Sequence, residues 1–575
     1  MTRHTECLRW FILAGVALFP ATALIVPNAG STIFFLLVLA GFAVALRPAW
    51  RPALTRDERL VLAVFCLFVA VSLLTFLAGE WTAIGERKLG RHGRLLLIVP
   101  LFYAFKYARP DPGIVWPAVW AGALALGGWA IFEYAVLAPP DGRVKGSSLA
   151  IMYGNYALLV GAVLLAGASW WQARLGRWAW PVLGGGALAA LAGMVLSGTR
   201  GAWLALAAVG LVFAWHLVRR RGWHAAVLAA VALVLVVGVS LAWSSLGVAE
   251  RFAQVWQETQ RYFSAQAAAQ AASGPQSAWP RCFDGREALD NLRASLQLPP
   301  DVKVEVVADA VRLREAPERC QAGYALRFTN TAAHRSAAIH LPRQTLPGVT
   351  SQSARLLVRG RAEVRFADRP VVRVAAARDY QTLSFENAAA AGEGRPVEFW
   401  LPPRGRFWIV PIELAPGEYG FAHTYGAVAG RLEMWRAAWQ VFLERPWLGV
   451  GTGAFQQAVI RLAARGEVAP FIAGFDHAHN EYLTALAARG LAGLAALGLL
   501  YFLPGLVFWR AARDPHAGRR AAGMAGFVTV IAYACFGLTE AFLDHSITTT
   551  CLAFYVALFL AMMAGTARSD STDRA

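Results

Sequence analysis

The sequence has few charged residues for its length. Asp, Glu, Lys and Arg make up 16% of its 575 residues, whereas an average soluble domain has about a quarter. This deficit excludes an ordinary soluble globular protein. Hydrophobic residues make up 57% of the chain, and they gather in blocks of about 20, the length of a helix that crosses a bilayer. The sequence therefore predicts an all-α polytopic membrane protein.

The blocks predict about a dozen transmembrane helices, at 10–27, 32–46, 60–78, 94–108, 114–136, 153–171, 178–197, 203–218, 224–243, 483–508, 522–542 and 547–566. The first block has no convincing cleavage site, so we predict a helix there rather than a signal peptide. Lys and Arg concentrate in alternate connections, which the positive-inside rule assigns to the cytoplasm. We therefore predict an inner-membrane protein that crosses the bilayer many times, with both termini in the cytoplasm.

Residues 244–429 lack long apolar blocks and form one polar segment, which this topology assigns to the extracytoplasmic side of the membrane. Its short alternating runs predict a β-sandwich, with strands at 302–307, 324–330, 354–358, 363–366, 371–375, 382–385, 397–401 and 407–414. The predicted domains are thus helices 1–9 in 1–243, the mainly-β insert in 244–429, an amphipathic helix and loop in 430–482, and helices 10–12 in 483–575.

Other absences narrow the function further. No Cys/His spacing matches a zinc site, and no strand precedes the glycine-rich run at 449–453, which excludes a dinucleotide-binding turn. The net charge of +18 lies largely in membrane connections, so we expect no nucleic-acid partner. Cys282 and Cys320 lie in the polar segment, where they could pair as a disulfide or remain two thiols.

Several cations lie in connections on the predicted outer side, against the usual bias. They either extend toward lipid phosphates or bind a pyrophosphate at the membrane surface, which guanidinium groups match well. Arg200 is placed where one span breaks and the next begins, and such a helix N-terminus favours anions. These residues are Arg87, Lys88, Arg91, Arg94, Arg143, Lys145 and Arg200.

Two polar elements follow the insert. Residues 430–447 predict an interfacial helix that begins near Arg431, with an apolar stripe at Leu432, Trp435, Trp439 and Phe442. The loop before helix 10 contains His477, His479 and Asn480. Two histidines at this spacing could bind metal, but no third ligand is evident. The alternatives are a structural histidine at a helix start or a base, since neutral imidazole accepts protons near pH 7.

These motifs resemble the O-antigen ligase and polymerase superfamily of bacterial envelope enzymes. The resemblance rests on Arg200-x-x-x-Leu204, on the Arg431 helix with Gly449-Val450-Gly451, and on His479-Asn480 followed by Gly490 and Gly493. It implies a GT-C-like glycosyltransferase with an undecaprenyl-pyrophosphate-linked glycan donor and metal-independent, inverting chemistry without a cofactor.

The resemblance also implies roles for individual residues. His479 would take the proton of the acceptor hydroxyl, while Arg200 and Arg431 would neutralise the leaving pyrophosphate. His477 and Asn480 would support the base. The remaining outer cations would hold the donor: Arg87, Lys88, Arg91, Arg94, Arg143 and Lys145. The β insert departs from the family pattern and leaves the acceptor open.

Three acceptors are compatible with this donor chemistry: lipid A-core in a ligase, a growing glycan in a polymerase, and a protein hydroxyl in an O-oligosaccharyltransferase. A glycolipid transporter is an alternative of a different class, and a non-catalytic scaffold is another. A transporter places ionisable residues near the middle of its spans, whereas the notable charges here gather at the outer face. We therefore predict a transferase that works at the membrane surface, among membrane lipids.

Overall fold

The structure is a computed structural model, and it describes the chain in two compact units. The helical unit comprises Met1–Ala253, Met434–Val459 and Gly474–Ala575; the sheet unit comprises Gln254–Glu433 and Ile460–Ala473. The described residues are 3–139, 142–224, 259, 281–282, 298–308, 324–341, 354–366, 372–374, 381–385, 397–413, 426–465, 467–468, 472 and 474–572. The predicted ninth span at 224–243 lies outside them except for its first residue.

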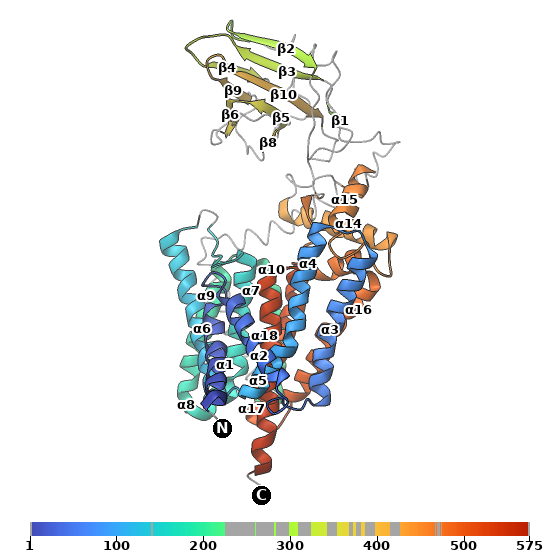
Figure 1. Ribbon diagram of the computed structural model, residues 1–575. Helices are drawn as coiled ribbons and strands as arrows, with labels where there is room; N and C mark the ends of the chain where they lie inside the picture. Colours follow the sequence, from blue (N-terminus) through green and yellow to red (C-terminus); the bar gives the residue numbers. More distant parts are fainter. Residues whose placement is uncertain are drawn as a thin grey trace. The chain divides into compact units, whose positions relative to one another are not determined.

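The helical unit is a bundle of mostly long apolar helices (Figure 1). From the first part of the chain it contains α1 (Arg3–Thr22), α2 (Ala29–Leu46), α3 (Arg56–Ala78), α4 (Ala83–Gly93), α5 (Ile98–Ala108), α6 (Pro112–Phe132), α7 (Ala150–Ala166), α8 (Ala168–Leu175), α9 (Ala179–Leu196) and α10 (Arg200–Arg221). The last part adds α16 (Glu481–Ala511), α17 (Ala517–Phe536) and α18 (Ser546–Thr572).

Within the described residues, 7 helices are long and apolar enough to cross a membrane. The prediction of a multi-pass, mainly helical protein is therefore confirmed, whereas the number of about twelve spans and the GT-C-like fold remain predictions. The predicted span at 94–108 is a 3-10 turn, Arg94–Leu97, followed by α5 with 11 residues. At 1.5 Å per residue α5 is about 17 Å long, which is too short to cross about 30 Å of hydrocarbon.

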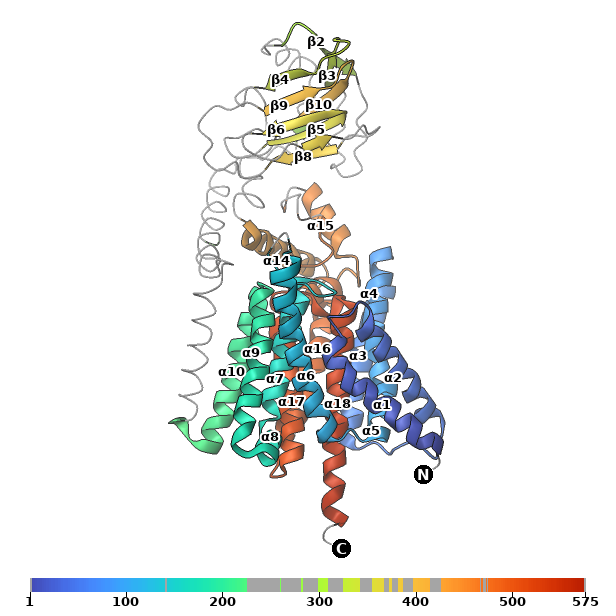
Figure 2. The same cartoon turned by 90° about the vertical axis from the view of Figure 1, so that its left-hand side faces the viewer.

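The helix α18 forms the centre of the bundle, as Figures 1 and 2 show. Its span is 89% buried, whereas the other candidate spans are 22% to 50% buried. It packs on α17, α5 and α2, while α16 packs on α3 and α17, and α6 packs on α1 and α9. The half-exposed outer helices present the apolar faces that a bilayer would cover.

A glycine-dependent break in α16 joins the bundle to the chain that follows α14 (Gly426–Glu444). Gly490 has φ +64°, a conformation that other residues rarely adopt. The amide of Leu491 there donates to the carbonyl of Pro446, and the amides of Val450 and Gly451 donate back to α16 at Ala487 and Ala488. The glycine run is therefore a turn that packs on the bundle.

The sheet unit has two antiparallel sheets, as expected from the alternating runs. One has the strand order β2-β3-β10-β5-β8 with β1 beside β10, and the other has the order β4-β9-β6-β7. The strands are β1 (Arg281–Cys282), β2 (Val302–Ala308), β3 (Tyr324–Asn330), β4 (Ala337–Leu341), β5 (Ala354–Gly360), β6 (Ala362–Phe366), β7 (Val372–Val374), β8 (Gln381–Phe385), β9 (Val397–Leu401) and β10 (Arg406–Glu413).

All eight predicted strands are present, and β1 and β4 are additional. The two sheets meet where Phe399 of β9 packs on Phe407 of β10, with ring centroids 5.4 Å apart. Both rings are fully buried, which agrees with the predicted sandwich architecture. Cys320 is outside the described residues, so the predicted disulfide with Cys282 remains untested.

The helix α14 coincides with the helix predicted after the insert. Its buried residues include Met434, Ala437 and Val441, whereas Trp439 of the predicted stripe is 49% exposed. The other members of the stripe, Leu432, Trp435 and Phe442, are half-buried. Trp439 packs on Phe442 with ring centroids 5.2 Å apart. An exposed tryptophan beside an apolar face is compatible with a helix at a membrane interface.

Candidate functional site

Two loops meet at one end of the helical unit and hold its main polar cluster. One is Asp476–Asn480 before α16, and the other connects α17 to α18. Asn480 caps α16, because its Oδ1 accepts hydrogen bonds from the amides of Tyr482 and Leu483, both at 3.0 Å. Its Nδ2 donates to the carbonyl of Leu538 in the other loop at 3.0 Å. The predicted supporting residue thus joins the two loops.

His479 is held in a conformation that leaves one ring nitrogen available. Its backbone has φ +46°, which is uncommon outside glycine and is found at sites where the surrounding structure enforces it. Its Nδ1 lies 2.9 Å from Oε2 and 3.1 Å from Oε1 of Glu540. The side chain is 24% exposed, and within the described chain its Nε2 has no hydrogen-bond partner. This is the arrangement of a histidine oriented by a carboxylate.

His477 differs from His479 because both of its ring nitrogens contact carboxylates. Nδ1 lies 2.6 Å from Asp476 Oδ1 and Nε2 lies 2.8 Å from Glu540 Oε1. Burial lowers the pKa of His477, but the hydrogen bonds with Asp476 and Glu540 outweigh burial and raise it to about 9. His477 is therefore an imidazolium at neutral pH, and it cannot accept a proton there.

The two carboxylates beside His477 remain ionised. Burial raises the pKa of Glu540, but the hydrogen bonds from His477 and His479 bring it well below its ordinary value. Burial also raises the pKa of Asp476, while the hydrogen bond from His477 and the charge of Lys88 lower it to about 2. The Glu540 carboxylate favours the imidazolium form of His477.

The helix α4 contributes a second, buried group around Asp544. Lys88 Nζ lies 2.6 Å from Asp544 Oδ2 and donates to the carbonyl of Asp476 at 2.7 Å. His92 Nε2 lies 3.2 Å from Asp544 Oδ1, and Arg91 donates to the Asp544 carbonyl at 2.7 Å. Burial raises the pKa of Asp544, but the Lys88 charge and the His92 hydrogen bond outweigh it and lower that pKa.

Two further predicted cations, Arg143 and Arg200, lie near the connection between α9 and α10. Arg143 donates to the Ser197 carbonyl at 2.9 Å, and Arg200 is the first residue of α10. Gly201 lies against Thr539, because a Cβ built on it would be 2.1 Å from Thr539 Oγ1. The N-terminus of α10 is thus packed beside the residue that precedes Glu540, so the backbone of Arg200 is close to the histidine cluster.

Other predicted residues lie apart from the cluster or have partners of another kind. Arg87 is exposed on α4, and Arg94 contacts Ser31 Oγ at 3.4 Å and the Phe35 ring. The amide of Lys145 donates to Glu133 Oε1 at 2.8 Å. Arg431 lies on α14 and is half-buried.

His477, His479 and Glu540 also form a group that could hold a metal ion, since their ligand atoms all lie within 4.8 Å of one another. The sequence interpretation found no third ligand, and Glu540 supplies one. A metal requires neutral imidazole, whereas His477 donates to two carboxylates here. Hydrogen bonding and metal binding are therefore competing uses of the same three side chains.

Glu540 and Asp544 are the main site residues that the sequence interpretation missed. The predicted span at 522–542 includes Glu540, but α17 ends at Phe536, so Glu540 lies in the loop. An unpaired carboxylate within a span is costly, and this cost is the signal that could have ended the span earlier. Arg489 within α16 was also missed; it is 1% exposed, and its guanidinium lies 3.6 Å from Glu481.

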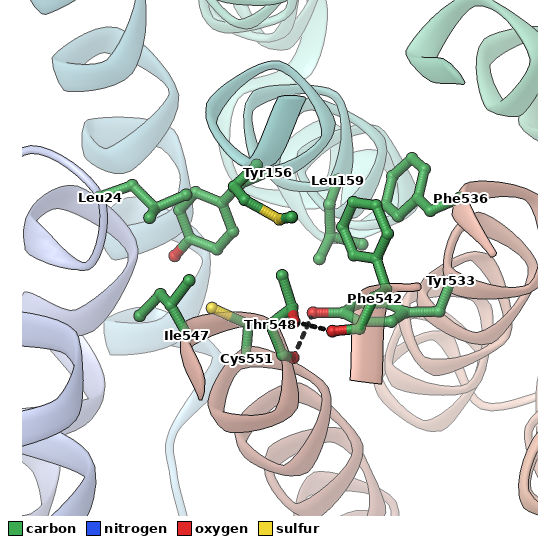
Figure 3. A pocket seen from close by; sticks show the side chains of 10 residues that line it. Leu24, Tyr156, Leu159, Tyr533, Phe536, Phe542, Ile547, Thr548 and Cys551 are labelled. Carbon is green, nitrogen blue, oxygen red and sulfur yellow. Dashed lines mark hydrogen bonds between the residues drawn. The ribbon is translucent and has the colours of Figure 1, made fainter. Parts of the chain in front are cut away.

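A small cavity lies beside the second loop, between α7, α17 and α18 (Figure 3). It is lined by apolar and hydroxyl side chains, including Tyr156, Phe542 and Thr548. Its volume of about 10 Å³ is close to the minimum for one water molecule. The cavity is therefore a packing gap in the core and cannot accept a sugar.

Comparisons with known proteins agree with the resemblance inferred from the motifs. Residues 374–498 match the family model described as O-antigen ligase, which includes Arg431, His477 and His479 and confirms the resemblance. A Haemophilus influenzae protein described as uncharacterized is 22% identical over 120 residues, 21% of this chain and 30% of that protein. This alignment spans less than a third of the relative's length. With the apolar helices, the family match supports a multi-pass membrane enzyme of the ligase or polymerase type.

Proposed function

We propose that this protein, with its O-antigen ligase match at residues 374–498, is an inverting glycosyltransferase of the bacterial inner membrane. It transfers a glycan from undecaprenyl pyrophosphate to a hydroxyl group of lipid A-core on the periplasmic side. The observation that carries the proposal is the His479–Glu540 contact of 2.9 Å, which leaves the second imidazole nitrogen available for a proton.

His479 is the base in this proposal. The acceptor hydroxyl attacks the anomeric carbon, and its proton passes to His479 Nε2. The bond between the anomeric carbon and the pyrophosphate oxygen breaks, and undecaprenyl pyrophosphate leaves with that electron pair. Glu540 stabilises the imidazolium that forms, as an oriented carboxylate does in other histidine bases. His477 is already protonated and supplies positive charge rather than a base.

The leaving pyrophosphate needs compensating positive charge, and pyrophosphate is otherwise a good leaving group. We assign this role to Arg200 at the start of α10 and to Arg431 in the matched segment, with Arg87, Arg91 and Arg143 holding the carrier. Helix N-termini and guanidinium groups both favour phosphate oxygens. Lys88 is buried on Asp544 and beside Asp476, so we assign it to positioning the loops rather than to donor contact.

We propose that the reaction needs no metal, because the ring nitrogens of His477 are occupied by hydrogen bonds to carboxylates. The same donor chemistry serves a polymerase that extends a glycan or an enzyme that modifies a protein hydroxyl. The sheet unit, which departs from the family pattern, is the element that we assign to acceptor recognition.

The experiment uses the full protein in lipid nanodiscs with an undecaprenyl-pyrophosphate-linked oligosaccharide. Lipid A-core, a non-reducing glycan end and a serine-containing protein are supplied separately, with and without EDTA, and released carrier and modified acceptor are measured. We expect carrier release with lipid A-core, unchanged by EDTA and lost in Arg200→Ala.

Modification of the glycan or the protein instead would replace the ligase assignment with polymerase or protein transferase. Loss of turnover in EDTA, with recovery on adding a divalent metal, would overturn metal independence. Absence of turnover with every acceptor, together with movement of the carrier across the bilayer when the same protein is reconstituted in sealed vesicles, would overturn the transferase assignment in favour of transport.

A further inference from the structure

A large cavity lies in the described part of the helical unit, and His479 is not among its lining residues. It is a groove between α9 and α10 with α7 at its base, and we call it the α9–α10 groove. Its volume is about 1540 Å³, which is larger than the common range of roughly 300–1,000 Å³ for small-molecule pockets. The helix α16 begins beside the histidine cluster, and α8 and the start of α17 lie near its other end (Figures 1 and 2). Residues of α8, of the α16–α17 connection and of the start of α17 line the groove.

The lining of the groove is mostly apolar and partly open to the outside. Leucine and alanine side chains predominate, and Leu188 of α9 and Leu211 of α10 line it while being 54% and 72% exposed. A glycan or a free anion gains nothing from such a surface. Hydrocarbon chains do, because removing apolar surface from water or filling a lateral gap in a bilayer favours them.

Three arginines lie at one end of the groove: Arg219, Arg513 and Arg520. Arg219 and Arg513 both lie close to the Trp215 ring, with their guanidinium carbons 5.6 and 5.5 Å from its centroid. Arg513 also lies 4.3 Å from the ring of Trp509, which stacks on Trp215 at 4.3 Å. The stacked tryptophans thus hold two guanidinium groups in fixed positions.

These two cations lack an acidic partner among the residues that the structure describes. The nearby carboxylate is Asp514, and it is engaged elsewhere: it lies 3.3 Å from Arg519 and accepts from the amide of His516 at 3.0 Å. Arg520 donates to the carbonyls of Asp514 and Pro515. Like charges on one ring repel each other, so an anion between Arg219 and Arg513 would stabilise this arrangement.

We propose that the α9–α10 groove binds an anionic phospholipid. Its acyl chains fill the apolar groove, and its phosphate accepts hydrogen bonds from Arg219 and Arg513. Basic pockets between membrane helices recognise anionic head groups in this way. The arginine-rich connections at this end are those that the positive-inside pattern assigns to the cytoplasm, so the lipid belongs to the cytoplasmic leaflet and is separate from the proposed glycan donor.

The test measures lipid binding to the full-length protein in detergent by native mass spectrometry. Phosphatidylglycerol and phosphatidylcholine with identical acyl chains are titrated, so that the head-group charge is the difference. We expect phosphatidylglycerol to bind at least about tenfold more tightly. The double variant Arg219→Gln/Arg513→Gln should bind it about 30-fold more weakly, from roughly a fivefold contribution of each cation.

The matched control is Arg174→Gln/Arg177→Gln. These arginines also lie over tryptophan rings, Trp170 and Trp178, and do not line the groove, so this variant should bind phosphatidylglycerol normally. Ala207→Trp fills an exposed position of the groove and should weaken both lipids. Equal affinity for the two lipids, or equal losses in both double variants, would overturn the proposal. So would absence of any bound lipid in the folded wild type, which would indicate that another segment of the chain occupies the groove.

Discussion

Replacing Glu540 by glutamine tests whether its carboxylate acts on the reaction through His479. The Glu540 carboxylate contacts His479 at 2.9 Å and His477 at 2.8 Å and is 7% exposed at its side chain. A glutamine amide has one acceptor and one donor end. With its oxygen at the Oε1 position, which lies 2.8 Å from His477 Nε2 and 3.1 Å from His479 Nδ1, its NH₂ group replaces Oε2 and faces His479, so His479 loses its 2.9 Å contact and the negative charge.

The expected fall in kcat follows from the charge of these contacts. A hydrogen bond to a charged group contributes about 1.5–3 kcal/mol. If the His479–Glu540 hydrogen bond strengthens by this amount as His479 gains its proton, losing the carboxylate lowers kcat about 10–150-fold. The KM for the donor should remain unchanged because Glu540 does not contact the donor in this account.

The assay is steady-state carrier release in nanodiscs over a range of pH. Glu540→Asp keeps the charge on a shorter side chain and should recover part of the rate. The melting temperature of each variant reports whether the fold is intact. A Glu540→Gln enzyme with kcat within about twofold of wild type would refute the claim that the carboxylate acts through His479.

Three further predictions concern stability, each measured by thermal unfolding in detergent. Because the pKa of His477 is raised from 6.5 to about 9, the contribution of its protonated form to stability is complete below pH 6.5 and is lost as pH rises through 9. His477→Gln should flatten this alkaline decline in stability. An unchanged slope would show that His477 is not its cause. Asp544→Asn breaks a buried ion pair and should cost about 3–5 kcal/mol, whereas Asp514→Asn, at an exposed ion pair, should cost under about 1 kcal/mol; equal effects would contradict the assignment. Gly490→Ala should destabilise α16, because φ is +64° and a Cβ would lie 2.4 Å from the Trp447 backbone. Gly498→Ala in the same helix meets open space and should be neutral or gain up to about 1 kcal/mol. Similar results for both variants would refute the claim that the break in α16 depends on Gly490.

Helices and strands were largely predictable because their signals are local. Apolar blocks located the described spans, and alternation located β2, β3 and six other strands. Their ends were less predictable, because helix termination depends on packing. Phe536 ends α17 six residues before the predicted limit, and α5 is shorter than a span because a 3-10 turn precedes it.

The composition of the site was predictable only in part. His479 and Arg200 were identified from local motifs, but Glu540 is 61 positions from His479 and comes into contact only when two loops meet. For the same reason, the sequence could not distinguish His477 from His479. The two histidines differ because a second carboxylate, Asp476, contacts His477 and does not contact His479.

The most direct test of the account is the effect of His479→Ala on a single turnover of donor bound to the full protein in nanodiscs. The account predicts that carrier release with acceptor present slows by about 10²–10⁴-fold, while donor affinity and melting temperature stay near the wild-type values. Release at a rate within about threefold of wild type would show that His479 is not the base, and the proposed mechanism would have to be abandoned.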